Sequence, residues 1–168
     1  EAVEGGYTFW DPPRDTVRAS ALSNPCIRAI TFEALGHRTP HNSRTRRVFR
    51  LGNLIEEAIV KEMRAANLLG HEQVEVEHDT LPISGHVDVI IYRDEKLLVG
   101  EIKSINHFNF SKLPDEHGYV VAGKSPLMKK HENYVRQWNT YAGLTDIHEG
   151  FILFEEKDFG GQRVYWLK

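Results

Sequence analysis

The sequence predicts a mixed α/β fold, in which a central β-sheet is flanked by helices. Segments with the period of an amphipathic helix are followed by shorter segments in which apolar and polar residues alternate. The order along the chain is helix, strands, helix, strands, without repeats or low-complexity tracts. Its 168 residues suit one domain, residues 1–168, with a sizeable apolar core.

The N-terminal part is expected to begin irregularly and then to become helical. Residues 1–20 are polar and contain a Pro-Pro step, so we expect an irregular lead-in. Ser23 is expected to cap a helix over about residues 25–35, which Gly36 ends. The segment 37–47 is rich in arginine and has no period, which indicates a basic loop.

The strongest helical pattern runs over about residues 48–69 and is expected to end at Gly70. Its apolar positions form one stripe: Leu51, Leu54, Ile55, Ala58, Ile59, Met63 and Ala66. At about 100° per residue, Glu57 lies opposite this stripe and should be solvated. Glu56 lies on its border, from where its side chain can reach the sheet. Glu62 falls within the stripe and needs a partner if it is buried.

A strand and a β-hairpin follow this helix. Residues 73–77 alternate between apolar and polar side chains, as expected for a strand. The apolar runs 89–92 and 97–99 flank the polar residues 93–96. This pattern predicts a hairpin with a four-residue loop.

The open end of this hairpin gathers charged side chains. Folding it back brings Asp88 and Glu101 close together on two neighbouring strands. Alternation puts Glu101 and Lys103 on one face of the second strand and Ile102 on the other. Two carboxylates and an ammonium group make poor core, but they suit a hard cation and a phosphate. The residues therefore predict a site for a cation and a phosphate, without identifying a reaction.

The C-terminal half is expected to contain a long loop, a helix and two closing strands. Residues 106–130 contain Gly and Pro, and a loop of that length in a compact domain is usually functional. Its aromatic and lysine residues suit single-stranded nucleic acid, so it is a candidate active-site loop. A partly packed insertion explains the same composition. A helix is predicted over residues 131–142, and strands over 150–155 and 163–167.

Four short motifs follow one another along these elements: Gly52-x-x-x-Glu56-Glu57, Gly85-x-x-Asp88, Glu101-Ile102-Lys103-Ser104 and Gln137-x-x-x-Tyr141. Together they resemble the PD-(D/E)XK nuclease superfamily, in the RecB-like branch of CRISPR-associated and viral exonucleases. Each motif alone is weak, but four in this order, over roughly residues 22–157, are much more specific. The resemblance implies a restriction-endonuclease-like core, with a central mixed sheet flanked by helices.

The resemblance also implies a chemistry for these residues. One or two Mg²⁺ or Mn²⁺ ions would be held by Glu56, Asp88, Glu101 and the Ile102 carbonyl. Many members have His where this chain has Glu56, which keeps a ligand but changes its charge. Lys103 would position the attacking water or help to deprotonate it. Gln137 and Tyr141 would lie close to the active site and brace the lysine or contact the substrate strand.

Basic and polar residues near the motifs are candidate nucleic-acid contacts. Arginine forks suit phosphate oxygens, and an arginine-rich stretch runs into the helix of Glu56: Arg44, Arg46, Arg47 and Arg50. A solvated loop explains the same run of charge. In the resemblance, Arg28 is a candidate for gripping a terminal phosphate. Ser104, which ends the third motif, and His131, which precedes the fourth, are further candidates.

Composition excludes several classes of cofactor and location. Ser23-x-x-Cys26-x-Arg28 resembles a motif of the iron–sulfur members of the branch, but a cluster needs about four cysteines and this chain has one. We therefore expect no iron–sulfur cluster, and Cys26 should be a small buried residue. No apolar run reaches the roughly 18 residues of a membrane helix. The N-terminus has no secretion signal, so a cytoplasmic protein is expected.

The leading hypothesis is a metal-dependent deoxyribonuclease of phage or recombination and repair type. We expect an exonuclease or an end- or flap-processing enzyme, because the branch is dominated by such enzymes and we see no separate domain to read sequence. Two alternatives stay open: a non-catalytic DNA-binding subunit of a recombination or CRISPR-type complex, and a restriction-like endonuclease. The net charge of -3 allows a local basic groove for DNA. Polarity, strand preference, RNA as substrate, the number of metals, and an oligomer or partner protein are left undecided.

Overall fold

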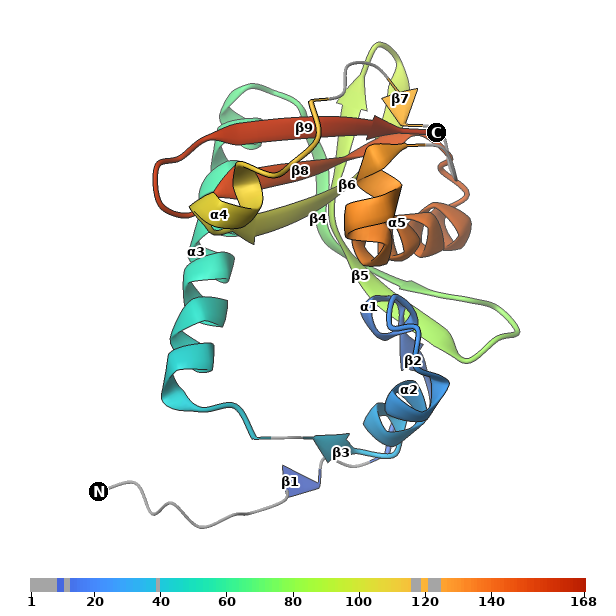
Figure 1. Cartoon of the computed structure of the whole chain (residues 1–168). Coiled ribbons are helices and arrows are strands. Elements are labelled where there is room, and N and C mark those ends of the chain that lie inside the picture. The colour runs from blue at the N-terminus through green and yellow to red at the C-terminus, as the bar shows by residue number, and fades with distance from the viewer. Residues whose placement is uncertain (1–8, 11–12, 39, 116–118, 121–124) are drawn as a thin grey trace.

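A seven-stranded mixed sheet forms the centre of the computed structural model, which describes residues 9–10, 13–38, 40–115, 119–120 and 125–168. Its strands are β2 (Val17–Arg18), β4 (Leu69–Glu77), β5 (Ile83–Arg93), β6 (Lys96–Ile105), β7 (Tyr119–Val120), β8 (Gly150–Glu156) and β9 (Gln162–Leu167). The order is β2-β5-β6-β8-β9-β7, and β4 also pairs with β5 (Figure 1). A separate two-stranded sheet pairs β1 (Phe9–Trp10) with β3 (His37–Arg38). The predicted mixed α/β fold is therefore confirmed.

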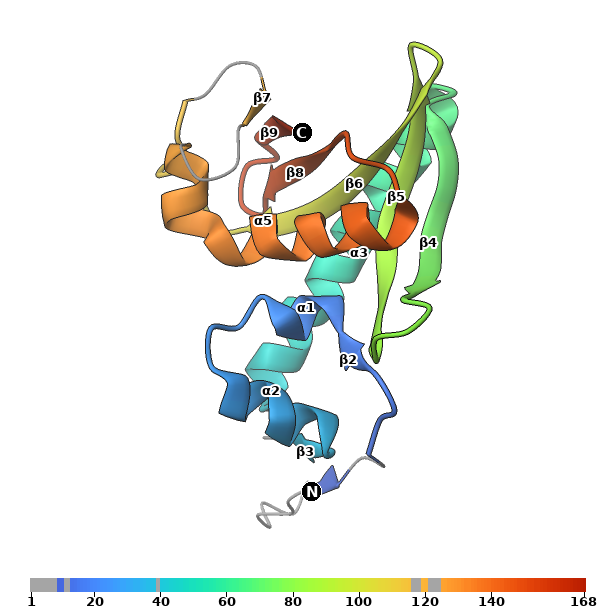
Figure 2. The ribbon, with the colours of Figure 1, turned by 90° about the vertical axis from the view of Figure 1, so that its right-hand side faces the viewer.

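Two long helices cover opposite faces of the sheet (Figure 2). The helices are α1 (Ala19–Leu22), α2 (Ile27–Ala34), α3 (Ser43–Ala65), α4 (His107–Phe110) and α5 (Pro126–Thr145). On one face, Trp138 of α5 packs in a buried cluster with Phe154 of β8. On the other, Ile59 of α3 packs with Ile102 of β6. In the described part of the chain, no helix is long and apolar enough to cross a membrane.

The pair β6–β8 forms the buried middle of the sheet. It is parallel, and Glu101 stands beside Ile152 in its register. The run Phe151 to Phe154 is apolar without alternation, as expected for a strand covered on both faces. The Trp138 indole donates to the carbonyl of Val99 at 2.9 Å, which ties α5 to β6. β6 therefore carries Glu101 and Lys103 on a rigid element.

The predicted hairpin of β5 and β6 is present, but its loop is shorter than expected. Arg93 pairs with Lys96, which leaves a turn of two residues. Asp94 and Glu95 both have left-handed backbone angles, with φ of 49° and 63°. These angles belong to the type I′ turn that matches the twist of paired strands. The four-residue loop was wrong because neither residue is the glycine that marks such a turn.

The N-terminal part is more ordered than predicted. Within the expected irregular residues 1–20, β2 joins the main sheet parallel to β5, and α1 begins at Ala19. The helix predicted over residues 25–35 is α2, but Ser23 does not cap it, since its hydroxyl donates to the carbonyl of Ser20. Cys26 occupies the cap position and is exposed, so its predicted burial was wrong.

Helix α3 begins and ends earlier than predicted. The side chain of Asn42 accepts the Thr45 N–H at 2.9 Å and starts the helix at Ser43, inside the expected basic loop. The helix ends before Asn67, whose φ of 56° makes the left-handed turn that Gly70 was expected to make. Gly70 lies instead in β4.

The apolar stripe of α3 is only partly buried. Ile59 and Val60 are buried, whereas Leu51 and Leu54 are exposed, because the N-terminal half of α3 extends beyond the sheet (Figure 1). Glu62 is exposed and so does not need a buried partner.

The segment 106–130 is not a plain loop. It contains α4, β7 and the first residues of α5, which starts at Pro126 with the Ser125 side chain accepting the Leu127 N–H at 3.0 Å. His131, the predicted first residue of that helix, is instead a kink with non-helical angles. Of the aromatic and lysine residues expected to contact nucleic acid here, Lys124 lies outside the described residues. The two closing strands are confirmed as β8 and β9.

Candidate active site

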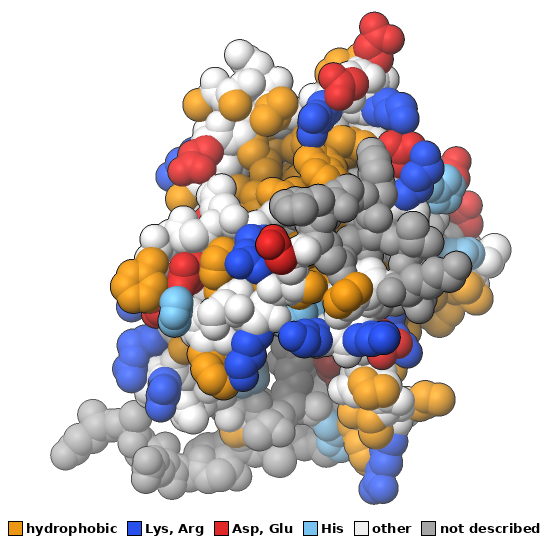
Figure 3. Space-filling model, turned by 45° about the horizontal axis from the view of Figure 1, so that its top comes forward, with side chains coloured by type: hydrophobic (Ala, Val, Ile, Leu, Met, Phe, Trp, Pro, Cys, Tyr) orange, Lys and Arg blue, Asp and Glu red, His pale blue; other side chains and the backbone are white. Residues whose placement is uncertain are grey.

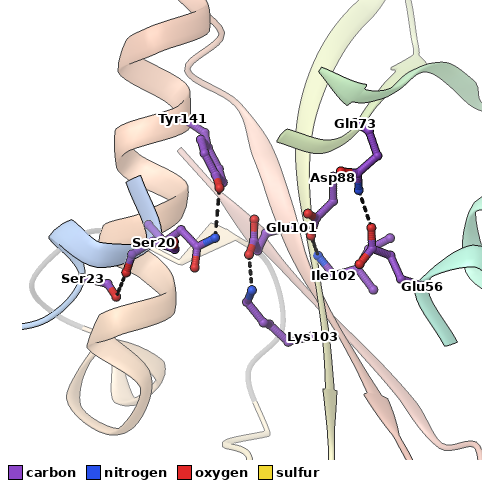
Figure 4. A network of polar contacts seen from close by, with 10 residues as sticks. Ser20, Ser23, Glu56, Gln73, Asp88, Glu101, Ile102, Lys103 and Tyr141 are labelled. Carbon is purple, nitrogen blue, oxygen red and sulfur yellow. Dashed lines mark hydrogen bonds and ion pairs between the residues drawn. The ribbon is translucent and has the colours of Figure 1, made fainter. Parts of the chain in front are cut away.

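Strands β5 and β6 separate at the position of Asp88 and Glu101. The last pair in their ladder is Val89 with Gly100. Beyond it, the Asp88 carboxylate accepts the backbone N–H of Ile102 at 2.8 Å. The side chain thus satisfies a backbone donor that would otherwise need another acceptor. This separation opens the sheet beside two acids and brings their carboxylates together (Figure 4).

Glu101 is the most unusual side chain of the site, because it is charged by nature and has 0 % of its surface exposed. The Lys103 ammonium forms an ion pair with its Oε1. Oε1 is thus engaged by Lys103, whereas Oε2 has no hydrogen-bond partner within the described part of the chain. Burial first, and then the charge of Asp88, raise the pKa of Glu101 to about 8. A buried carboxylate with an oxygen to spare is costly for the fold and calls for a ligand.

Lys103 remains an ammonium group in this setting. Burial alone would lower its pKa, but the carboxylates of Glu101 and Asp88 outweigh that effect, so the pKa of Lys103 is raised above its ordinary value of 10.5. Its Nζ also lies 5.6 Å from the centre of the Tyr134 ring, within range of a cation–π contact. The side chain can therefore donate hydrogen bonds and offset negative charge, but it holds no free lone pair.

A second pair of carboxylates connects the sheet to α3. Burial raises the pKa of Asp88, against the opposing effects of Lys103 and the Ile102 N–H. Burial and the charge of Asp88 raise the pKa of Glu56 to about 7. The side-chain amide of Gln73 donates to Oε1 of Glu56 at 2.5 Å. Glu56 thus reaches the sheet from the border of the helix, as its position in the sequence indicated.

Helix α5 closes the other side of the site. Tyr141 is 3 % exposed, and burial followed by the charge of Glu101 raises the pKa of its hydroxyl to about 12. Gln137 donates to that hydroxyl at 3.1 Å. A Cβ atom at Gly85 would lie 2.6 Å from the Tyr141 ring, so only glycine lets the ring approach β5 so closely. Similarly, a Cβ at Gly52 would lie 3.2 Å from the Ser104 hydroxyl.

The predicted nucleic-acid residues are spread over α2, α3, β6 and α5. His131 is half-buried and stacks on Tyr134, with ring centres 5.8 Å apart, and burial lowers its pKa. Arg28 is exposed over the Phe32 ring. The four arginines lie on exposed turns of α3: Arg44, Arg46, Arg47 and Arg50. On the face drawn in Figure 3, basic and acidic side chains are interspersed.

Two residues at the site were missed by the sequence interpretation as functional candidates. Helical spacing places Tyr134 on or near the face of Gln137 and Tyr141, but the spacing alone did not mark it as a residue of the site. Gln73 lies in a strand pattern that gives no sign of its contact with Glu56.

The donor chemistry of the cluster fits a hard divalent cation. The spare oxygen of Glu101, the Asp88 carboxylate and the Ile102 carbonyl are oxygen ligands of the kind that Mg²⁺ and Mn²⁺ take. Among the described residues, however, no three His, Cys, Asp or Glu side chains are arranged to hold a metal ion. Glu56 is engaged by Gln73. The cluster therefore contains oxygen ligands for a cation, but the described side chains do not form a complete coordination site.

Comparison with solved structures adds a likeness of fold. An alkaline exonuclease from Laribacter hongkongensis, LHK-Exo, matches with a TM-score of 0.56 at 14% identity, covering 92% of this chain and 78% of that one. The chain has a nuclease-like fold. A protein called SSO0001 matches with a TM-score of 0.52 at 16% identity, over 92% of this chain and 69% of that one. The sequence matches no protein-family model and no curated protein.

Both likenesses show the fold alone, a mixed sheet packed against helices.

Proposed function

We propose that this protein is a Mg²⁺- or Mn²⁺-dependent deoxyribonuclease that acts at DNA ends or flaps. The proposal is carried by the fully buried Glu101, whose Oε1 is paired with Lys103 and whose Oε2, close to Asp88, has no hydrogen-bond partner among the described residues. A structural ion pair in the core would be expected to satisfy both oxygens. The nuclease-like fold supports the same conclusion.

Four groups would hold the cation: Asp88, Glu101, the Ile102 carbonyl and Glu56. When bound, it polarises the scissile phosphate and lowers the pKa of a bound water. Lys103, fixed as an ammonium group by its two acidic neighbours, orients that water and offsets the charge that develops on the phosphate. Its protonated state makes it a donor rather than the base. Tyr141, held by Gln137, keeps water from the buried side of Glu101.

The substrate strand would approach between the site and the outer half of α3. Arg44, Arg46, Arg47 and Arg50 would contact its phosphates, with Arg28, Ser104 and His131 as further contacts. Such phosphate contacts carry no sequence information, which suits an enzyme that recognises an end. We propose that it acts in the cytoplasm of a bacterial, archaeal or virus-infected cell.

Digestion of end-labelled DNA tests this function. Single- and double-stranded substrates are incubated with the protein and Mg²⁺ or Mn²⁺, beside Lys103→Ala and the control Lys157→Ala, which changes a lysine in the turn between β8 and β9. We expect cleavage by the unchanged protein and by the control, and a loss of about 10²–10³-fold in Lys103→Ala. Cleavage retained in Lys103→Ala would refute the assigned site.

Closed circular DNA separates the remaining alternatives. An enzyme that requires ends leaves it intact, whereas a restriction-like endonuclease opens it. If the unchanged protein binds DNA without cutting any substrate, it is instead a DNA-binding subunit.

A further inference from the structure

Gln73 has a backbone conformation that its residue type disfavours. It lies inside β4, yet its φ is 48°, in the left-handed region. For a residue with a Cβ this costs on the order of 1–3 kcal/mol and persists only where the surroundings impose it. Glutamine has no local reason to adopt it, unlike glycine or asparagine.

The distortion lies directly across from the site. In the ladder of β4 and β5, Glu72 pairs with Val89 and Val74 with Val87, so Gln73 stands opposite Asp88. From there its amide donates to Oε1 of Glu56 at 2.5 Å. One side chain thus connects the acid of α3 to the strand position that faces the acid of β5 (Figure 4).

Packing does not explain this side chain. Gln73 is exposed and, with Glu56, lines a cleft of about 500 Å³ between α3 and β4. The helix and strand are already joined across this cleft by the ion pair of Arg64 and Glu72, at 2.7 Å. The distorted backbone therefore serves the contact with Glu56 rather than the attachment of the helix.

We propose that Gln73 is a positioning residue for the metal site: its amide fixes one oxygen of Glu56 and leaves the other free for the cation. The inference rests on the proposed function, because it assigns Glu56 to the metal. A donor that orients a ligating side chain typically contributes 10–100-fold to metal affinity or activity.

The test measures Mn²⁺ binding without DNA, by titration calorimetry, in the unchanged protein, Gln73→Asn and Glu75→Gln. Asparagine tolerates the left-handed backbone but is one carbon shorter, so its amide does not reach Glu56. Glu75 is an exposed residue of the same strand and serves as the control. We expect Gln73→Asn to bind Mn²⁺ about 10–100-fold more weakly and to keep its melting temperature and its KM for DNA. Its cleavage rate should recover at high Mn²⁺.

A second variant separates positioning from structure. Gln73→Gly removes the backbone strain and should raise the melting temperature while weakening Mn²⁺ binding. A residue with a purely structural role would not show these opposite effects.

The possible results separate the positioning role of Gln73 from the proposed nuclease function. Unchanged or tighter Mn²⁺ binding in Gln73→Asn, with cleavage by the unchanged protein, overturns the inference alone. Weaker binding in Gln73→Asn, without cleavage of any DNA by the unchanged protein, supports the positioning role and refutes the nuclease. An unchanged protein that does not bind Mn²⁺ overturns both.

Discussion

Two glutamates are buried in the same part of the sheet, Glu101 on β6 and Glu156 at the end of β8, and their surroundings differ. Glu156 is 6 % exposed and is hydrogen-bonded to the exposed His107 of α4, next to the turn that leads into β9. Glu101 is 0 % exposed, and its partner Lys103 leaves an oxygen without a hydrogen bond. Of the described residues, Glu101 alone has a buried side-chain oxygen without a hydrogen-bond partner.

The difference separates an acid whose contacts have a structural explanation from one that is a candidate for function. The contacts of Glu156 fasten the turn of residues 157–161 to α4, where Asp158 also accepts the backbone N–H of His107 at 2.6 Å. The contacts of Glu101 are incomplete and close to a second acid. Burial alone therefore does not indicate a site, whereas burial with an unused oxygen beside a second carboxylate does.

The largest expected contrast is in cleavage. Glu101→Gln keeps the shape of the side chain but removes the charge that would bind the cation, so the rate with Mn²⁺ should fall by about 10³-fold. Glu156→Gln keeps an oxygen for His107, and its rate should stay within about twofold. Rates on end-labelled DNA measure both. A similar loss in the two variants would show that the unused oxygen does not mark the site.

The next contrast is in stability against pH without metal. Because the folded pKa of Glu101 is raised from 4.5 to about 8, the folded protein binds more protons than the unfolded chain in this window. The free energy of unfolding should therefore fall as the pH rises from about 5 to 8, by up to about 1.4 kcal/mol per unit. Urea unfolding in EDTA measures it. Glu101→Gln should reduce the slope to the part that comes from Glu56, whose pKa is also raised, to about 7, and Glu156→Gln should leave it unchanged. A stability that rises over this range contradicts the assignment.

The smallest contrast concerns two closely packed glycines, Gly85 beside Tyr141 and Gly161 beside Glu156. Gly85→Ala places a Cβ 2.6 Å from the Tyr141 ring and 3.1 Å from the Ala19 Cβ, so it should destabilise by about 1–3 kcal/mol and slow cleavage. Gly161→Ala places its Cβ 2.8 Å from Oε2 of Glu156 and 3.0 Å from the Phe110 ring, so it should also destabilise the fold, but cleavage should be unchanged. Thermal unfolding and the cleavage assay measure both. Equal effects of the two substitutions on the cleavage rate would mean that Tyr141 does not support the site.

Strict alternation explains why the centre of the site could be predicted. Side chains of a strand change face at every residue, so Glu101, Ile102 and Lys103 had to be distributed as the structure has them once β6 was recognised. The helical period similarly placed Glu56 at the border of α3. In both cases the geometry follows from the repeat of one element.

Features set by single backbone angles could not be predicted in the same way. Asp94, Glu95 and Gln73 adopt left-handed angles, which glutamate and glutamine disfavour. The sequence therefore indicated neither the length of the turn nor the contact of Gln73 with Glu56. The kink at His131 depends on its packing against Tyr134 and Phe154. The start of α3 could not be predicted from apolar periodicity, because its first residues are polar and only Asn42 marks the cap.

The hydrogen bond between Asp88 and the Ile102 N–H also determines how an inactive protein should be made. Removing Asp88 would leave a backbone donor without its acceptor at the point where β5 and β6 separate, at a cost of about 1–3 kcal/mol. The opening between the strands would then change together with the chemistry. Glu101 accepts no such bond, so its carboxylate can be neutralised without disturbing the main chain. A complex with uncut DNA is therefore better trapped with Glu101→Gln than with Asp88→Ala.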